Sequence, residues 1–426
     1  MKAMKHFFGK GWAICMTLIF TISMASAQSK LVELKGSVLA SESEKPLESA
    51  ILSVKGTNIS TVTNADGQFS LKIDASTNAD KILVSHPGYK NKELPVNNFQ
   101  QDNLTIYLNE NLTELSQVFL TNYTDAESLV REVLKKKKEN NLNQSVLMTA
   151  FYREAIKRRR KNVSLTEAVV ELEKKPYSSS KRDEVHLQIA RKKTNYKRLD
   201  TLAFKLQGGP FTTLYIDIMK YPEYIFTYET LGDYEFTFAP PSSIDNRPVY
   251  VVNFKQKEGI TALRYTGTLY IDAESVALAS ANYRLNLENK SAIRNAFVKK
   301  KPRDVIVYPT ETAYKVKYRQ KNNKWYYTYG SVELTFKVNK KRKLFNQVYS
   351  VSSEMAVTDW EIEETAKLNK KGKDKLRPSV ILADRISGFS DPNFWGEYNL
   401  IEPEKSIETA IEKIKRQIKR EERRKS

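Results

Sequence analysis

Cysteine is almost absent from this chain. The 426 residues contain one cysteine, Cys15, which lies close to the N-terminus. Disulfides and cysteine-based metal sites are therefore excluded from the rest of the chain. Histidine is nearly as rare, because His86 and His186 are the only two beyond residue 27. A zinc hydrolase needs several ligands around one ion and a serine triad needs a histidine base, so neither site is expected.

Four short motifs that mark common catalytic sites are also missing. The sequence contains no GxSxG nucleophile turn, no HExxH zinc motif, no GxxxxGK(S/T) phosphate loop and no GxGxxG dinucleotide loop. We therefore predict no catalytic residues, no cofactor-binding residues and no metal ligands. The chain is expected to have no enzymatic activity of its own.

Long apolar runs are absent as well. The longest, residues 12–24, is shorter than the ~20 residues that a membrane helix needs. Three lysines precede it within residues 2–10, and Ala-Ser-Ala at residues 25–27 fits a signal peptidase site. Residues 1–27 are therefore predicted to be a signal peptide, and the protein is expected in the periplasm or associated with the outer membrane. Nucleic acid is then not an expected partner.

Acidic residues are scarce in one part of the chain only. The formal charge is +20, with 70 Lys and Arg against 50 Asp and Glu. Residues 28–110 hold eight Lys and ten acidic residues, whereas residues 111–426 carry a formal charge of +19. The stretch FYREAIKRRRKN, residues 151–162, has six basic residues among its twelve. This charge predicts binding to anionic envelope components, with peripheral membrane contact, or to an outer-membrane protein.

What is present in the first part is a series of short β-type segments. Seven such segments, separated by turn signals, lie between residues 31 and 110. Asp66-Gly67 is one of these turns, since glycine accepts the positive φ that a tight turn requires. Seven strands in about eighty residues are typical of a small two-sheet sandwich.

The motifs of this part resemble those of the carboxypeptidase regulatory-like domain, which has a transthyretin-like fold. The residues that carry the resemblance are Gly36-Ser-Val38, Pro46-Leu-Glu-Ser-Ala50, Val54-Lys-Gly56-Thr57, Thr63-Asn-Ala-Asp-Gly-Gln-Phe69 and Val84-Ser-His-Pro-Gly-Tyr89. Such domains are common in exported proteins of the Bacteroidetes type. The resemblance implies an accessory module without catalytic residues. Ser49 departs from the family, where a glycine is usual.

The second part begins with an amphipathic helix. Thr124 and Glu127 have the spacing of a capping box. Apolar residues then recur at helical spacing on one face, namely Ala126, Leu129, Val130, Val133 and Leu134. This helix is expected to pack against another element.

From there to about residue 354, β signals dominate. Residues 332–338 alternate strictly, with Val332, Leu334, Phe336 and Val338 on one face. The basic residues 157–161 lie where a turn is expected, between two strands of a hairpin. Such alternation predicts an antiparallel sheet that is covered on one side. The fold class is therefore mainly β with flanking helices: a transthyretin-like sandwich followed by a larger antiparallel β-rich α+β domain.

Two further resemblances concern this second part. Residues 265–287 resemble a segment of the cradle-shaped carriers that sort bacterial lipoproteins. The segment around residues 151–154, together with the end of the chain, resembles an uncharacterised exported family. The predicted organisation is a signal peptide at 1–27, the sandwich at 28–110, a linker at 111–123, a basic β-rich domain at 124–400 and a basic amphipathic helix at 401–426.

Candidate binding residues come from two patterns. Acidic and aromatic residues lie close together around Trp360, with Asp359 and Glu361, and again in Asp391, Trp395 and Glu397. An aromatic platform beside acids is typical of sugar-binding and sugar-cleaving sites. The basic turn supplies the other pattern. The surface candidates are Trp360, Asp391, Trp395, Arg158, Arg159 and Arg160.

These observations predict an exported, non-enzymatic protein with a binding or scaffolding role at the periplasmic or outer-membrane surface. One alternative is a carrier that holds a lipid or acyl chain in a curved sheet. The other is a carbohydrate-binding or carbohydrate-active protein.

Overall fold

The computed structural model describes residues 31–77, 80–96, 104–111, 123–159, 161–194, 207–289, 293, 305–340, 346–362, 374–386 and 394–403. The expected signal peptide, most of the expected linker and the expected C-terminal helix from residue 404 onward lie outside these residues. No helix of the described residues is long and apolar enough to cross a membrane.

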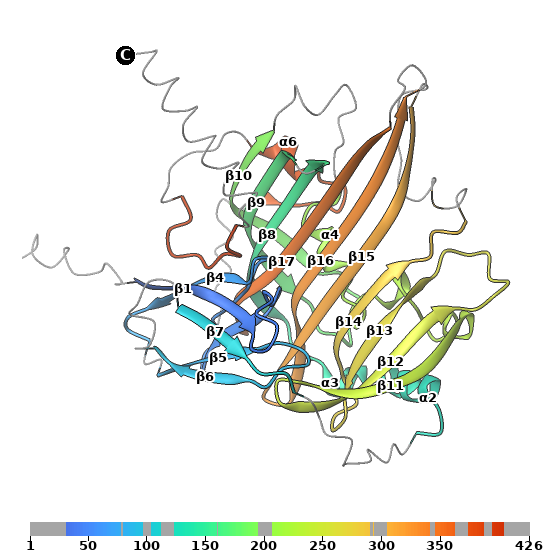
Figure 1. The fold of residues 1–426 in the computed structure, drawn as a ribbon, viewed down its shortest axis with the longest axis horizontal. Coiled ribbons are helices and arrows are strands. Elements are labelled where there is room, and N and C mark those ends of the chain that lie inside the picture. Colours follow the sequence, from blue (N-terminus) through green and yellow to red (C-terminus); the bar gives the residue numbers. More distant parts are fainter. Residues whose placement is uncertain are drawn as a thin grey trace, which may run out of the picture.

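The N-terminal part is a sandwich of two small sheets (Figure 1). One has the order β4-β1-β7, and the other has the order β3-β2-β5-β6. Its seven strands are β1 (Leu31–Ala40), β2 (Ile51–Val54), β3 (Ser60–Val62), β4 (Gln68–Asp74), β5 (Lys81–Ser85), β6 (Lys92–Pro95) and β7 (Leu104–Leu108). β1 pairs antiparallel with β4 and parallel with β7. The predicted seven-stranded sandwich is therefore confirmed.

The core of this sandwich follows from the alternation of its strands. Side chains of both sheets meet in one buried cluster, which includes Leu34, Val38, Phe69, Leu71 and Ile106. Gly67 has φ +73° in the turn before β4, as the Asp-Gly pair predicts. A Cβ at this position would lie 2.6 Å from the carbonyl oxygen of Val38, so a larger residue would not fit.

The second part is built on one eleven-stranded sheet with the order β11-β12-β13-β14-β15-β16-β17-β8-β9-β10-β18. All of its pairings are antiparallel. The strands are β8 (Val146–Arg158), β9 (Lys161–Lys174), β10 (Glu184–Thr194), β11 (Tyr234–Ile244), β12 (Arg247–Gln256), β13 (Tyr265–Asp272), β14 (Leu278–Leu285), β15 (Val305–Lys321), β16 (Lys324–Lys340), β17 (Gln347–Ile362) and β18 (Asp374–Lys375).

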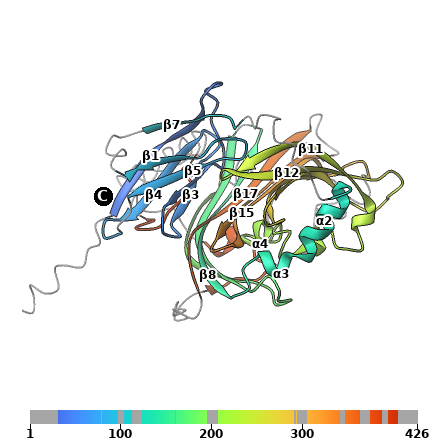
Figure 2. The same ribbon diagram turned by 90° about the horizontal axis from the view of Figure 1, so that it is seen from below.

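The sheet curls around a set of short helices, which fill its inner face (Figure 2). These elements are α2 (Ala126–Lys135), α3 (Lys137–Asn140), α4 (Phe211–Leu214), η2 (Pro222–Tyr224), η3 (Leu231–Asp233) and α6 (Leu382–Arg385). The expected alternation of residues 332–338 holds, because Val332, Phe336 and Val338 are buried on this face. The inner face is therefore the main hydrophobic core of the molecule.

Helix α2 starts one residue later than the capping-box spacing predicts. Asp125, rather than Thr124, is the N-cap, and its Oδ1 accepts a hydrogen bond from the backbone nitrogen of Ser128 at 2.6 Å. Glu127 pairs instead with Arg131 one turn later, at 2.6 Å. Aspartate caps helices as well as threonine does, so the sequence offered two neighbouring caps and the structure uses the second. The predicted buried face of the helix is confirmed.

The outer face of the sheet is also covered, which corrects the prediction of a sheet covered on one side only. The N-terminal sandwich docks there through β3 and residues 394–401. Ile51 and Val62 of the sandwich share a buried cluster with Phe151, Val169 and Ala356 of the sheet. Hydrogen bonds join the same surfaces: the hydroxyl of Ser60 donates to the carbonyl of Val357 at 3.2 Å. Alternation could not reveal this contact, because the covering residues come from the other domain.

Candidate functional site

The basic turn of the sequence lies at one end of the longest strands. β8 ends at Arg158, and β9 begins at Lys161, which pairs with Arg158. Arg159 is exposed in the turn between them, with φ +54°. Arg160 lies outside the described residues. The predicted hairpin with basic residues at its turn is thus confirmed for the described positions.

A second hairpin ends beside the first one. In the sheet, β17 lies next to β8, and Tyr349 pairs with Arg158. The backbone nitrogen of Arg159 donates to the carbonyl of Val348 at 3.1 Å. On the other side of β17, Val348 pairs with Lys337 of β16. The chain that continues from the end of β16 reads Lys-Lys-Arg-Lys at residues 340–343.

A third strand begins at the same end of the sheet. β15 begins at Val305, which pairs with Lys340 at the end of β16. The chain just before β15 reads Lys-Lys-Lys-Pro-Arg at residues 299–303. The strand ends around this point contain neither Asp nor Glu, over residues 155–164, 305–310, 334–340 and 346–353. The topology therefore brings the ends of β8, β15, β16 and β17, with the described cations Lys157, Arg158, Arg159 and Lys337, to one end of the sheet (the upper end in Figure 1).

Exposed aliphatic side chains accompany these cations. Ile306 is 40% exposed and Val348 is 38% exposed. Beneath them lies a separate buried cluster formed by Ile156, Val163, Val305, Val307, Phe336, Val338, Tyr349 and Val351. This cluster holds the strand ends in place. We call the surface made by Lys157, Arg158, Arg159, Lys337, Ile306 and Val348 the basic edge.

The two tryptophan candidates are not on the surface. Trp360 is 8% exposed and Trp395 is 5% exposed, which corrects the expectation of an open aromatic platform. Trp360 packs against Tyr326, with ring centroids 5.0 Å apart. Trp395 packs against Phe151, with ring centroids 5.5 Å apart. The structure places the two rings in different buried clusters, and it does not bring them together.

The acidic candidates beside the tryptophans do not form an open pair. Asp391 lies outside the described residues. Asp359 lies near the end of β17, where burial and the neighbouring Glu361 raise its pKa, although a backbone hydrogen bond from Trp360 opposes this. Glu397 is exposed on the turn that carries Trp395. A sugar-cleaving site around the tryptophans therefore has no support in the described geometry.

Trp395 belongs instead to a buried ionic cluster on the outer face. Arg191 lies over its ring, with Cζ 4.7 Å from the centroid. Glu167 accepts from both Arg191 and Arg153, each at 2.7 Å. Arg153 also donates to the carbonyl of Ile401 at 2.7 Å. These contacts fasten the segment of residues 394–403 to the sheet, which is a structural role.

A second ionic cluster lies inside the core on the inner face. The Lys174 ammonium donates to Asp183 and to Asp217, each at 2.7 Å. Asp217 also accepts from the hydroxyls of Tyr177 at 3.1 Å and Tyr318 at 2.8 Å. The side chains of Lys174, Asp183 and Asp217 are 1% exposed or less. No local sequence pattern indicates this cluster, because Asp217 is 43 residues from Lys174 in the chain.

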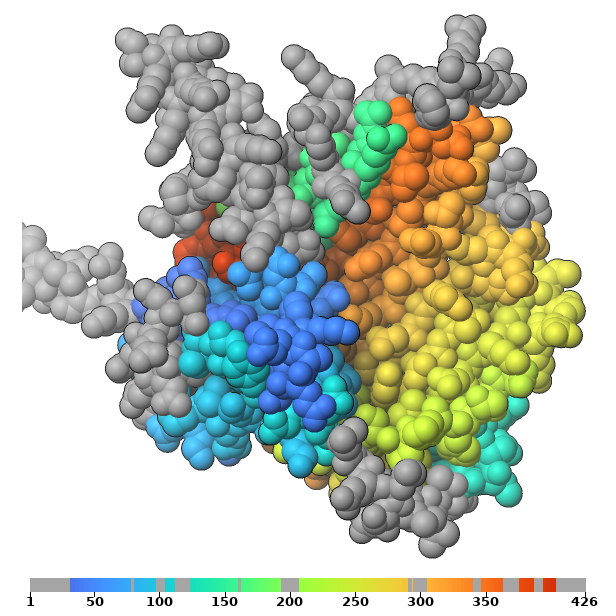
Figure 3. Space-filling model, viewed as in Figure 1, coloured from blue at the N-terminus to red at the C-terminus, as the bar shows by residue number. Residues whose placement is uncertain are grey.

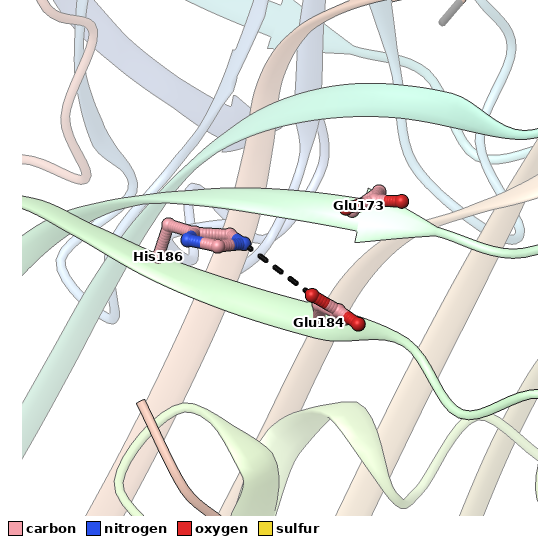
Figure 4. Close-up of side chains that lie close together, drawn as sticks. All are labelled: Glu173, Glu184 and His186. Carbon is pink, nitrogen blue, oxygen red and sulfur yellow. Dashed lines mark ion pairs between the residues drawn. The ribbon is translucent and has the colours of Figure 1, made fainter. Parts of the chain in front are cut away.

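A possible set of metal ligands lies on β9 and β10. One atom each from Glu173, Glu184 and His186 lies within 4.8 Å of the others (Figure 4). Both carboxylates already have lysine partners, because Glu173 pairs with Lys175 and Glu184 pairs with Lys375 at 2.5 Å. Two cations already offset the charge that would attract a metal ion, so this cluster is an ion-paired surface of the sheet.

The described residues form a hollow of about 840 Å³ on the outer face and another of about 310 Å³ beside η2. The larger lies next to the N-terminal sandwich and is lined mostly by polar and charged residues, whereas the smaller includes Tyr224 and Arg264. The curved inner face, where a carrier would hold an acyl chain, is filled by the protein's own buried side chains. The larger hollow was not predicted, since it depends on which strands are neighbours.

Comparison with known proteins identifies the first domain. Residues 34–120 match the family of CarboxypepD_reg-like domains. The N-terminal sandwich is a carboxypeptidase regulatory-like domain. The resemblance drawn from the sequence motifs is thereby confirmed for this part of the chain. No curated protein matches the chain.

Solved structures with some likeness to this chain cover a little over half of it. One is a DUF1329 family protein from Desulfovibrio piger, with 10% identity, a TM-score of 0.23 and coverage of 57% of this chain and 96% of that chain. A domain assigned to outer membrane lipoprotein sorting, from Vibrio parahaemolyticus, has 10% identity, a TM-score of 0.23 and coverage of 57% and 94%. A LolA superfamily protein from Nitrosomonas europaea has 11% identity, a TM-score of 0.19 and coverage of 57% and 99%. We derive the function from the site itself.

Proposed function

We propose that this protein is a non-enzymatic binding protein of the cell envelope, which attaches to an anionic lipid surface through the basic edge. The observation that carries the proposal is the basic edge at one end of the sheet. Four described cations lie there, namely Lys157, Arg158, Arg159 and Lys337. The formal charge of +19 beyond residue 110 gives the whole domain the same preference.

The magnitude is sufficient for reversible attachment. A basic residue near an anionic membrane surface contributes about 1 kcal/mol, so four of them contribute about 4 kcal/mol. Ile306 and Val348, which are 40% and 38% exposed, add apolar surface that a lipid interface can cover. A soluble polyanion would use the cations but would leave these two side chains in water. This difference favours lipid as the partner.

The expected route of the chain agrees with this proposal. Residues 2–27 have the pattern of a signal peptide, which would deliver the protein outside the inner membrane. The periplasmic face of the outer membrane or of the inner membrane then becomes the available surface. A carrier role is not favoured, because side chains of the protein fill the inner face.

Vesicle flotation tests the proposal. The protein without residues 1–27 is mixed with vesicles of phosphatidylcholine alone or with one quarter phosphatidylglycerol, at low and at high salt. We expect flotation only with phosphatidylglycerol at low salt, because exposed charges are screened within about 8 Å at physiological ionic strength. The triple variant K157E/R158E/R159E should bind at least tenfold more weakly.

A matched variant separates the basic edge from net charge. Lys45, Lys90 and Arg377 are exposed and lie outside the basic edge. The variant K45E/K90E/R377E has the same formal charge as the test variant and should float as the unchanged protein does. If both variants lost flotation equally, net charge alone would explain the binding. If the protein bound soluble polyphosphate but did not float with vesicles, its ligand would be a polyanion and not a lipid. Either result would contradict the proposal.

A further inference from the structure

The larger hollow is a groove on the outer face of the sheet. It has a volume of about 840 Å³, within the range of small-ligand sites. Its floor is formed by β11 to β16, and Glu48 of the N-terminal domain lines it as well. Figure 3 views this outer face, with the N-terminal domain in blue and cyan beside the yellow and orange strands. The complete groove therefore requires both domains.

A continuous row of polar side chains crosses the floor of the groove. The residues of this row pair in register from strand to strand, and all of them line the groove: Thr237, Asn253, Thr268, Asn282, Lys315 and Ser331. Paired residues on neighbouring strands have Cβ atoms about 5 Å apart. Apart from the Lys315 ammonium, which only donates, the row is thus a regular array of hydroxyl and amide groups that can donate and accept hydrogen bonds.

Charges of both signs stand beside this row in equal numbers. The groove is lined by Glu48, Glu235 and Glu333, and by Lys255, Arg284 and Lys315. Lys255 pairs with Glu235 at 3.0 Å, and Lys315 lies 4.0 Å from Glu48. The groove therefore has no net formal charge. This distinguishes it from the basic edge and excludes a strongly anionic polymer as its preferred ligand.

Two tyrosines lie beneath the floor of the groove at the place where β14 ends. β14 ends at Leu285, and its ladder with β15 ends at the pair Tyr283 and Tyr314. Beyond that pair, the hydroxyl of Thr312 accepts from the backbone nitrogen of Leu285 at 2.8 Å. Tyr283 and Tyr314 stack with an interplanar angle of 14°, and their rings pack in the inner-face core, beneath the floor of the groove. The exposed Ala313 lies next to Tyr314 and leaves space above the floor.

We infer that this groove binds a glycan chain. A sugar ring has hydroxyl groups on its edge and C–H groups on its faces. The polar row can hydrogen-bond to the hydroxyls, while Ala313 and the methyl groups of Thr237 and Thr268 can contact the C–H groups. The row runs across six strands, so it can contact several successive sugar units. A lipid chain does not fit this site, because it would leave the polar row without hydrogen-bond partners.

Arg284 and Glu333 have a specific place in this arrangement. Thr266 pairs with Arg284, and Ala313 pairs with Glu333, so the two charged residues lie on either side of the small Ala313. Planar guanidinium and carboxylate groups can each contact two neighbouring hydroxyls of a sugar. We assign these two residues to sugar recognition at the centre of the groove. The inference is independent of the lipid proposal, because none of the residues of the basic edge lines the groove.

Calorimetric titration tests the inference with three uncharged probes, cellohexaose, maltohexaose and a tetramer of N-acetylglucosamine. The protein without residues 1–27 is used in the absence of lipid. We expect at least one probe to bind with a Kd below about 1 mM. In A313W the new side chain fills the groove, and binding should fall at least tenfold. R284A and E333A should each weaken binding at least threefold.

Controls keep the test decisive. Glu311 is exposed on the same strand as Ala313 and does not line the groove, so E311A should bind as the unchanged protein does. If A313W does not fold, R284A and E333A still decide between the outcomes. Failure of all three probes to bind, or equal binding by A313W and the unchanged protein, would overturn the inference. The variant K157E/R158E/R159E should retain glycan binding, which separates this result from the lipid test.

Discussion

Two buried lysines of this protein have opposite surroundings. Lys174, on the inner face, lies 2.7 Å from each of two carboxylates. Burial alone would lower the pKa of Lys174, but Asp183 and Asp217 raise it above the ordinary value. Lys317, on the outer face, donates to the carbonyl of Ser49 across the domain junction, and no carboxylate of the described residues pairs with it. Burial, together with the nearby Lys315, lowers the pKa of Lys317 to about 7.

The difference teaches that the two faces of the sheet are held by different means. On the inner face, two carboxylates compensate the Lys174 ammonium and keep it charged near neutral pH. At the junction, a cation is buried against neutral groups and against His86, whose pKa burial and Lys317 lower to about 3. The carboxylates of Glu48 and Asp245 raise the pKa of Lys317, but they offset only part of the lowering caused by burial. Docking of the N-terminal domain is therefore the charge-sensitive contact of the molecule.

Removal of a carboxylate on the inner face should have the largest effect. The variant D217A leaves Lys174 with one partner and removes the acceptor of Tyr177 and Tyr318, so we expect a loss of roughly 3–5 kcal/mol in the free energy of unfolding. Urea denaturation followed by tyrosine and tryptophan fluorescence measures this loss. Asp80, which is exposed, provides the control variant D80A. A loss below about 1 kcal/mol in D217A would remove the distinction between the two lysines.

Replacement of Lys317, which has no carboxylate partner among the described residues, should increase the free energy of unfolding. The pKa of Lys317 is lower in the folded protein than in the unfolded chain, where it is near 10.5. The unfolded chain therefore binds more protons between about pH 7 and pH 10.5, and stability rises with pH across this window. K317M should flatten this rise and stabilise the protein by roughly 2–4 kcal/mol at pH 7.

Urea denaturation of K317M and of the unchanged protein at several values between pH 6.5 and pH 10 measures both effects. The variant K315M is the control, because Lys315 is partly exposed and lies 4.0 Å from Glu48. An unchanged pH slope in K317M would show that another group titrates at the junction.

Glu154 offers a test of pairing on the inner face itself. Burial raises the pKa of Glu154 to about 7, although hydrogen bonds from Tyr152 and Thr166 oppose the shift. The folded protein therefore binds more protons between about pH 4.5 and pH 7, and stability falls as the pH rises through this window. E154Q should remove that fall and gain roughly 1–3 kcal/mol at pH 7. Thermal melting at pH 5 and at pH 7.5 checks it; a pH-independent difference would count against titration of Glu154.

The smallest effect is expected at an exposed cap, where water already solvates the charge. D125A removes the cap of α2 and should cost about 1 kcal/mol, whereas T124A should cost close to nothing. Urea denaturation of the two variants side by side measures the difference. If T124A lost more stability than D125A, Thr124 would be the N-cap, as the capping-box spacing predicts. The series thus ranges from buried and paired charge, through buried and unpaired charge, to exposed charge.

Local patterns in the sequence were sufficient to predict the elements. The seven strands of the first domain, the basic hairpin turn at Arg158 and Arg159, and the buried face of residues 332–338 all follow from alternation and turn residues. These features depend on neighbours within a few residues of each other. The motifs of the first domain also predicted the family to which this domain belongs.

Contacts between distant segments could not be predicted. Trp395 is buried because the domains dock and because residues 394–403 fold back on the sheet, and Trp360 is buried in the inner-face core. Alternation along one strand predicts neither contact. Lys337 lies near Lys157 and Arg158 only because β17 lies between β16 and β8. The groove depends on the order of six strands in the same way. Local sequence patterns therefore predict the positive charge of the basic edge, but they do not predict which segments form the basic edge or the groove.

The pairing of β17 with β8 also determines when the molecule can become compact. β8 is made early in the second domain, yet one of its two neighbours is the strand Gln347–Ile362 near the other end. Until that late strand emerges, β8 and β9 form a hairpin with an open edge, and the ladder cannot propagate across the middle of the sheet. Such long-range closure makes folding slow. A chain that stays unfolded while it is being synthesised is also one that a translocation channel can still thread.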